Sequence, residues 1–403
     1  MGISLNIVDS TQPEKVLREL RRALDSGGPA ILPRAAPRGG PSKSSETEFE
    51  LGGEDGGLGT DIVLIIETSG STGLPKRVAL DAQALRSSAT ASAAALGGRG
   101  QWLLAVPTHY IAGAAVLVRS LEAGTQPVVY PEQHFDAERF ATIASAMTHE
   151  HRYTSLVPVQ LARLVATIEA GSTRVAQAAR RFDGILIGGQ ALTAELSERA
   201  RGLGLRIRTT YGSSETAGGC VYDGVPFTNT AVRVREGMLE ISGPTLARGY
   251  LGDPIRTGEA FTENDGIRWY RTGDLGEISN GIVTVKGRAD NVIISGGEKI
   301  LLDSVERVVR EIHGFSEAVV IGVDDAMWGQ VPIVVASLPT PTGADVLATV
   351  RSRVAEQLGR AAAPARIETV TEIPLLDTGK PDRVRLTIAY RGDVTQNRPK
   401  QPR

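Results

Sequence analysis

The sequence predicts an α/β protein with a large N-terminal domain of mainly parallel sheets, ending in a small β subdomain, and a smaller α+β domain after it. The 403 residues suffice for about two to three domains of ordinary size. Short apolar runs alternate with alanine-rich helical segments through the first half of the chain, which is typical of parallel sheets. Beyond residue 225, short strands between glycine turns come first, and a new set of helices and strands follows.

The first domain begins with an amphipathic helix at residues 13–26, where leucine and valine side chains recur at helical spacing. A stretch rich in Gly, Pro, Ser and Glu at 34–59 predicts a long surface loop. The apolar runs after it are short and rich in β-branched residues, whereas the segments between them have helical composition. Strands are predicted at 62–68, 102–107, 127–130, 184–189 and 207–212, and helices at 82–96, 136–147 and 158–169.

The sequence pattern changes after residue 225, where short strands separated by glycine turns replace the alternation of strands and helices. The runs VRVREGMLEISGP, IRWYRTGDLGEIS and GIVTVKGR predict a small β subdomain of hairpins. The last unit is predicted to contain a helix at 302–313, strands at 318–323 and 331–338, and a helix at 343–358. We place the domain boundary between Arg288 and Asn291, which gives domains at 1–288 and 289–390 and a polar tail at 391–403 that we expect to be disordered.

Charge and cysteine content exclude several classes of partner. The chain has 44 Lys+Arg against 46 Asp+Glu and a pI near 6.3, so it has no basic footprint for nucleic acid or an anionic membrane surface. Its single cysteine, Cys220, cannot form an intrachain disulfide. No signal peptide and no apolar run of about 20 residues are visible. We expect a cytoplasmic protein that does not insert into membranes, and the sequence leaves a homodimer open.

The strongest chemical signal is the segment TSGSTGLPK at 68–76, directly after the predicted strand IVLIIE. Glycines let backbone N–H groups surround phosphate oxygens, hydroxyls add donors, and the lysine adds positive charge. The segment is not a Walker A motif, because Pro75 stands where that motif has glycine before its lysine. A flexible surface loop is the alternative reading. The residues expected to contact phosphate are Thr68, Ser69, Gly70, Ser71, Thr72, Gly73 and Lys76.

Four more motifs follow in order: YGSSET at 211–216, YRTGD at 270–274, GRAD at 287–290 and TGK at 378–380. With TSGSTGLPK they resemble the signature motifs of the adenylate-forming superfamily, which includes acyl-CoA synthetases, peptide-synthetase adenylation domains and luciferases. The resemblance runs from about Ile62 to Arg383. It implies an N-terminal domain that binds ATP and an acyl substrate, and a mobile C-terminal domain that carries a catalytic lysine.

The resemblance also implies roles for single residues. Asp274 and Arg288 would bind the ribose hydroxyls, and Tyr211 would lie against adenine. Glu215 would supply a carboxylate oxygen to Mg²⁺ on the ATP phosphates. Lys380 would stabilise the transition state of adenylation. If each residue is considered alone, the alternative is that Asp274 merely caps a β-turn and that Glu215 is a solvated acid in a loop. The other residues assigned to the nucleotide are Gly189, Gly212 and Ser214.

The acyl group is assigned to segments that follow predicted strands. His109, in VPTHYIAG, matches a family position beside the acyl carboxylate, although an isolated histidine is more often part of the fold. The other histidines show no metal spacing apart from the triplet His149-Glu150-His151, whose two histidines would point apart on a helix, and we interpret the triplet as a solvated cluster. Cys220 is interpreted as pocket lining rather than as a nucleophile. The remaining acyl-site candidates are Ser155, Gln190, Gly218 and Gly219.

Two segments narrow the resemblance within the superfamily. TSLVPVQL at 154–161 and YGSSETAGGCVYDG at 211–224 resemble the 2-succinylbenzoate:CoA ligases of menaquinone synthesis, in particular those of actinobacteria. This implies ATP, Mg²⁺ and coenzyme A, a small aromatic acid as substrate, and an acyl-adenylate intermediate. Asp290 would be the hinge of the mobile domain, and Gly297 would face the CoA tunnel, where a hairpin turn is the alternative reading. Another acyl-CoA synthetase, for an aromatic or medium-chain acid, and an enzyme that loads a carrier protein remain alternatives.

Overall fold

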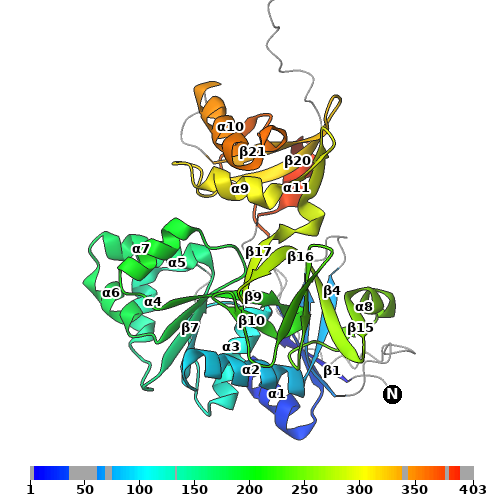
Figure 1. Cartoon of the computed structure of the whole chain (residues 1–403). Helices are drawn as coiled ribbons and strands as arrows, with labels where there is room; N and C mark the ends of the chain where they lie inside the picture. Colours follow the sequence, from blue (N-terminus) through cyan, green and yellow to red (C-terminus); the bar gives the residue numbers. More distant parts are fainter. Residues whose placement is uncertain are drawn as a thin grey trace, which may run out of the picture. The chain divides into compact units, whose positions relative to one another are not determined.

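The computed structural model describes residues 4–35, 61–68, 75–131, 134–337, 344–376 and 381–390 (Figure 1). These residues divide into two compact units. The first comprises Met1–Arg233, Glu240–Thr272 and Ile278–Val283, and the second comprises Val234–Leu239, Gly273–Glu277 and Thr284–Arg403. Within the described part of the chain, no helix is both long and apolar enough to cross a membrane. The domain boundary at Arg288 stays a prediction, as does disorder of the tail, which lies outside the described residues.

The first sheet of the N-terminal unit carries the strand that leads into the predicted phosphate loop. Its order is β1-β2-β3-β4-β14, with β1, β2 and β3 parallel and β4 antiparallel to β3. The strand β3 is apolar and buried from Ile62 to Ile66, as expected of a strand covered on both faces. The elements are β1 (Leu5–Asp9), α1 (Pro13–Ser26), β2 (Ala30–Arg34), β3 (Ile62–Thr68), β4 (Lys76–Asp81) and β14 (Gly249–Tyr250).

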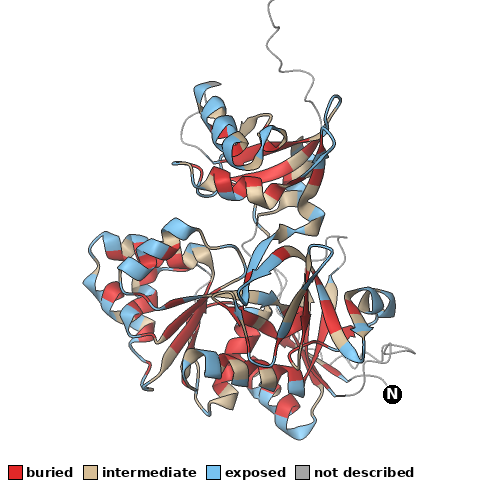
Figure 2. Cartoon of the chain, in the orientation of Figure 1, coloured by how far each residue is buried: buried red, intermediate tan, exposed pale blue. Residues whose placement is uncertain are grey.

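The second sheet has the order β11-β10-β9-β8-β7-β5-β6, in which the strands from β9 to β6 are parallel. A large apolar cluster packs α4, α5 and α6 on one face, and α2 packs against α3 elsewhere in the unit (Figures 1 and 2). The strands are β5 (Gln101–Leu104), β6 (Val128–Val129), β7 (Arg152–Leu156), β8 (Gly184–Ile187), β9 (Ile207–Ser213), β10 (Gly218–Tyr222) and β11 (Val225–Pro226). The helices are α2 (Ala82–Leu96), α3 (Ile111–Glu122), α4 (Ala137–Ala144), α5 (Pro158–Glu169), α6 (Thr173–Arg180), α7 (Ala194–Gly202) and the short η1 (Ser214–Thr216).

A third sheet, of order β12-β13-β16-β15 with β17 beside β16, corresponds to the predicted β subdomain. Its strands belong partly to one unit and partly to the other. The strand β16 is long and contains the whole YRTGD motif. The elements are β12 (Ala231–Arg235), β13 (Met238–Ser242), α8 (Pro254–Ala260), β15 (Phe261–Asn264), β16 (Ile267–Ser279) and β17 (Ile282–Arg288).

The C-terminal unit is a mixed sheet of order β19-β18-β21-β20, with β22 beside β21 and an apolar cluster on each face. One cluster packs α9 and α10, and the other includes Leu386 of α11. The elements are η2 (Ala289–Asn291), β18 (Val292–Ser295), β19 (Glu298–Leu301), α9 (Leu302–Arg310), β20 (Val319–Asp325), β21 (Gly329–Ala336), α10 (Ala344–Leu358), η3 (Arg360–Ala362), β22 (Ile367–Thr369) and α11 (Arg383–Tyr390).

Most predicted elements lie where the periodicity places them, and α1, α2, α5 and β3 have the predicted bounds. The helix predicted at 136–147 ends earlier, at Ala144, and His149 and His151 lie beyond it. The two histidines form a tight turn in which the His151 N–H donates to His149 Nδ1 over 3.0 Å, so they do not point apart on a helix. The helix predicted at 302–313 ends earlier, at Arg310. The loop predicted at 34–59 lies almost wholly outside the described residues.

Candidate active site

The predicted acyl and adenine residues gather at one edge of the second sheet. The strands β5, β7, β8 and β9 are parallel neighbours, so the segments that follow them meet at the carboxyl edge. His109 follows β5, Gln190 follows β8, and Tyr211 lies near the end of β9. In open α/β sheets ligands bind at this edge. The sheet topology therefore brings predicted residues together that are about 100 positions apart in the chain.

The YGSSET motif turns the chain from β9 into β10, and close backbone packing explains its glycine. A Cβ atom at Gly212 would clash with the Gly218 carbonyl oxygen, so a larger residue would force the two strands apart. The Thr216 hydroxyl donates to the Gly218 carbonyl over 2.7 Å, and the Ser213 N–H donates to Thr216 Oγ1 over 2.9 Å. Ser214 is buried in the same turn. These contacts hold Glu215 in one place.

Glu215 is the best candidate for a metal ligand in the described residues. Its side chain is buried with 6% of its surface exposed, and Oε1 accepts a 2.9 Å hydrogen bond from the Tyr250 hydroxyl. No group of three or more His, Cys, Asp or Glu in the described residues could hold a metal by itself. One carboxylate nevertheless suits the Mg²⁺ that the family resemblance implies, since this ion is commonly held by one or two carboxylates together with substrate phosphates.

Two contacts fix His109 at the carboxyl edge of the second sheet. Its Nδ1 lies 2.9 Å from the Ser10 hydroxyl, and its ring lies 4.1 Å from that of Tyr110. The helix α3 begins two residues later, and its residue Ile111 lies beside Gly218. His109 and Gly218, which were assigned to the acyl group separately, are therefore carried by adjoining segments. The positions agree with an acyl site here, and the roles stay predictions.

The other acyl candidates divide between the sheet and its edge. Ser155 lies within β7 and is buried, and by strand alternation it shares a sheet face with Tyr153, whose ring packs on Trp102 at 5.1 Å. Gln190 follows Gly189, whose φ of +82° favours glycine. Gly219 is close to Thr210 on the neighbouring strand. Ser155 is thus the most enclosed of these candidates, and its contact with a substrate stays a prediction.

Cys220 has no chemical signature of a nucleophile. The residue is completely buried on β10, and this burial raises the pKa of its thiol to about 12. At neutral pH the thiol is therefore protonated, whereas the thiolate is the nucleophilic form. The interpretation that Cys220 does not act as a nucleophile agrees with this geometry.

In the C-terminal unit, the two predicted ribose residues lie together. Arg288 Nη1 is 3.2 Å from Asp274 Oδ1, and the guanidinium also covers Gly273, whose φ of +73° turns the strand at the motif. Burial acts to lower the pKa of Arg288, but hydrogen bonds and charge interactions with Asp290 and Asp274 raise it. The guanidinium therefore connects the predicted ribose acid with the predicted hinge residue, since Arg288 Nη2 is 3.2 Å from Asp290 Oδ2.

Asp303, which the sequence analysis did not single out, clamps the segment around the predicted hinge. Its Oδ2 accepts from the Arg288 N–H over 2.9 Å, and both of its oxygens accept from Asn291 Nδ2 over 3.2 Å. A Cβ at Gly287 would collide with the Asp303 carboxylate. The Asn291 amide donates to this carboxylate, which an ionised aspartate at the same position could not do. No local pattern in the sequence indicates this contact.

Gly296 and Gly297 form the two-residue turn of the β18–β19 hairpin. Their φ values are +58° and +87°, as a type I′ turn requires, and Ser295 pairs with Glu298 across it. A Cβ at Gly296 would strike the Trp328 ring, whereas a Cβ at Gly297 would meet nothing within 4 Å. The hairpin reading is therefore correct, and a role in a CoA tunnel stays a prediction. Six of the predicted site residues lie outside the described part of the chain: Ser69, Gly70, Ser71, Thr72, Gly73 and Lys380.

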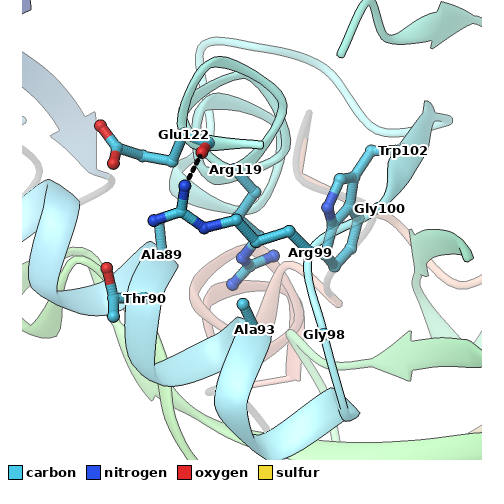
Figure 3. A pocket seen from close by; sticks show the side chains of 9 residues that line it. All are labelled: Ala89, Thr90, Ala93, Gly98, Arg99, Gly100, Trp102, Arg119 and Glu122. Carbon is cyan, nitrogen blue, oxygen red and sulfur yellow. Dashed lines mark hydrogen bonds between the residues drawn. The ribbon is translucent and has the colours of Figure 1, made fainter. Parts of the chain in front are cut away.

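A separate small pocket lies beside the start of β5 (Figure 3). Its charged wall is Arg119, which is buried against the Trp102 ring at 4.8 Å, and Arg99, which donates to the Glu122 carbonyl oxygen over 2.7 Å. Because it lies at the amino end of β5, whereas His109 follows the carboxyl end, it is not the candidate active site.

Family models match most of the chain. Residues 3–251 match the AMP-binding enzyme model, and residues 304–380 match the model of the C-terminal domain of AMP-binding enzymes. The chain belongs to the AMP-binding enzyme family. The superfamily and the α/β fold class predicted from the motifs are thereby confirmed.

Several relatives of this AMP-binding enzyme are named as 2-succinylbenzoate–CoA ligases. The probable 2-succinylbenzoate–CoA ligase of Mycobacterium tuberculosis is 36% identical over 98% of this chain and 100% of the relative. The 2-succinylbenzoate–CoA ligase of Escherichia coli K12 is 32% identical, but the match covers 66% of this chain and 57% of the relative. Of these two matches, the one with the mycobacterial enzyme extends over nearly the whole of both chains.

Solved structures agree with these relatives. The o-succinylbenzoate CoA synthetase of Bacillus subtilis in complex with its acyl-adenylate intermediate superposes with a TM-score of 0.73 at 25% identity, covering 97% of this chain and 84% of that one. The same enzyme in complex with ATP and magnesium ion gives a TM-score of 0.69 at 27% identity, covering 80% and 69%.

Proposed function

We propose that this AMP-binding enzyme is an ATP-dependent 2-succinylbenzoate–CoA ligase of menaquinone biosynthesis. The observation that carries the proposal is the full-length similarity to the mycobacterial ligase. The geometry supports it, because a buried carboxylate, a histidine and small residues converge at the carboxyl edge of a parallel sheet. The enzyme uses ATP, Mg²⁺ and coenzyme A. A cytoplasmic location and a homodimer stay predictions.

The proposed reaction has two halves. In the first, a carboxylate oxygen of the acid attacks the α-phosphorus of ATP, an acyl-adenylate forms and pyrophosphate leaves. Lys76 and the loop before it hold the phosphates, and Lys380 stabilises the negative charge of the transition state. Glu215 would hold Mg²⁺, which neutralises phosphate charge when bound. Asp274 and Arg288 orient the ribose, so that the reacting atoms stay in line.

In the second half, the CoA thiol sulfur attacks the acyl carbonyl, the thioester forms and AMP leaves. The C-terminal domain, which begins near Arg288, rotates about Asp290 between the two half-reactions. The rotation removes Lys380 from the active site and brings the path of the CoA thiol, beside Gly297, to the acyl-adenylate. The Arg288–Asp290 contact and the Asp303 clamp lie at this segment. His109 and Ser155 contact the acyl group, and Gln190, Gly218 and Gly219 complete its pocket.

The substrate is tested with a panel of acids in the presence of CoA. We expect kcat/KM for 2-succinylbenzoate to exceed that for benzoylpropionate and octanoate by at least about 100-fold, because donors that bind the ring carboxylate would be left unpaired at about 1 to 3 kcal/mol each. Comparable rates on octanoate would identify a general acyl-CoA synthetase. If pyrophosphate is released but the acyl group is transferred to a carrier protein and not to CoA, the chain is a carrier-loading enzyme.

The thiol path is tested by Gly297→Leu. Because a Cβ at this position meets no neighbour within 4 Å, we expect the variant to fold and to release pyrophosphate in a single turnover, but to form thioester at least about tenfold more slowly. Gly266→Leu is the matched control, since Gly266 also lies in a hairpin at positive φ with open space around it, on a different sheet. Normal thioester formation in Gly297→Leu would remove this glycine from the thiol path.

A further inference from the structure

Tyr250 makes a buried hydrogen bond to Glu215 that no motif of the sequence predicted. Its ring is buried with 3% exposed, and its hydroxyl donates to Glu215 Oε1 over 2.9 Å. A phenol has one proton, and here that proton goes to the carboxylate, which can only accept.

Tyr250 contacts two segments that carry predicted ATP contacts. Lys76, at the end of the phosphate loop, places Nζ 5.5 Å from the centroid of the Tyr250 ring, within range of a cation–π contact. Glu215 belongs to the YGSSET motif. All three residues lie in the N-terminal unit. One tyrosine thus touches segments that are far apart in the chain.

The hydrogen bond constrains how Glu215 can act. The carboxylate has two oxygens, and Tyr250 takes up one acceptor site of Oε1, so Oε2 has the greater capacity for a cation. Hydrogen bonds to a charged group are stronger than those between neutral groups. The carboxylate is thereby fixed in rotation. A freely rotating glutamate would lose this rotational freedom each time it bound the metal, at a cost in affinity.

Tyr250 is well held without its hydroxyl. The Arg248 N–H donates to the Ala79 carbonyl over 2.9 Å and the Leu251 N–H donates to the Arg77 carbonyl over 2.8 Å, so β14 is joined to β4 on both sides of the tyrosine. Arg248 also forms a 2.6 Å ion pair with Asp81. Loss of the hydroxyl alone should therefore leave the strand in place.

We infer that Tyr250 is a positioning residue, which orients the Glu215 carboxylate toward the metal on the ATP phosphates. The inference depends on one part of the proposed function, which is that the enzyme binds a metal–ATP complex. It does not depend on which acid is the substrate. The structure assigns the orientation to one atom, the phenolic oxygen, because the ring contact with Lys76 survives its removal. Tyr250→Phe is consequently the variant that isolates it.

The experiment measures binding of Mn²⁺–ATP to the full chain without any acid, by electron paramagnetic resonance of free Mn²⁺. We expect Tyr250→Phe to weaken this binding by about tenfold and to raise the Mg²⁺ concentration at half-maximal pyrophosphate release, with a smaller change in binding of metal-free ATP. Combined with Glu215→Gln, Tyr250→Phe should have no further effect on Mn²⁺–ATP binding, as a shared interaction requires.

Tyr222→Phe is the matched control, because it removes another buried tyrosine hydroxyl. That hydroxyl is separate from the Tyr250–Glu215 contact and forms hydrogen bonds with Ser92 over 2.9 Å and with Arg119 over 3.3 Å. It should lower the melting temperature to a similar degree and leave Mn²⁺–ATP binding unchanged. Equal Mn²⁺–ATP affinity in wild type and Tyr250→Phe would overturn the inference. So would an equal loss in both variants. Failure of 2-succinylbenzoate as a substrate would refute the proposed function and leave this measurement intact.

Discussion

Replacement of Lys380 by alanine is expected to slow pyrophosphate release from acid and ATP by about 10²- to 10³-fold. A positioned donor acting on developing charge has an effect of this size, and the ammonium acts only while the carboxylate attacks the α-phosphorus. Thioester formation from preformed acyl-adenylate should stay within about threefold of wild type, because the adenylate has already been made. Rapid-quench measurement of the two half-reactions separates these rates.

Lys286→Ala is the control for Lys380→Ala. It removes the same charge from the same unit at an exposed position, where Lys286 pairs with Glu277 on the neighbouring strand. We expect it to change neither half-reaction by more than about twofold. A loss of both half-reactions to the same extent in Lys380→Ala would contradict a role confined to adenylation.

Glu306→Ala is expected to destabilise the C-terminal unit by about 3 kcal/mol. The carboxylate is buried and pairs with Arg383 over 2.6 Å and Arg310 over 2.8 Å, and it also accepts from the buried Val320 N–H over 2.9 Å. Removing one partner of a buried ion pair leaves the other charges and the amide unpaired, which costs about 3 to 5 kcal/mol when the pair is fully buried. Because Arg310 and Arg383 are partly exposed, we expect a loss at the lower end of this range.

Hydrogen exchange of the full chain measures this loss where it occurs. Amides of β20, which includes Val320, should exchange about 100-fold faster in Glu306→Ala, because about 1.4 kcal/mol corresponds to each factor of ten. Glu317→Ala removes an exposed glutamate from the same unit and should leave the exchange of β20 unchanged. Unchanged protection of β20 in Glu306→Ala would show that the buried pairs do not stabilise the unit.

Local patterns in the sequence were sufficient for the elements with strong periodicity and for the motifs. The helix α1 was predicted with its bounds because its apolar residues face one side and Pro13 begins it. The TSGSTGLPK, YGSSET and YRTGD motifs indicated the family because their chemistry is carried by a few neighbouring residues. Helix ends were less accurate: the helix predicted at 136–147 ends at Ala144, and a turn held by His149 itself comes shortly after it.

Patterns in the sequence were thus sufficient for the family and the fold class, and they predict the residues that bind ATP. Which of these residues touch one another depends on the tertiary structure. Tyr250 meets Glu215 because β14 joins the first sheet beside β4, although 35 positions separate the two residues. Asp303 likewise meets Asn291 only because α9 begins beside the hinge segment. Such contacts depend on sheet order and packing between distant segments, and neither is encoded in the spacing of neighbouring residues.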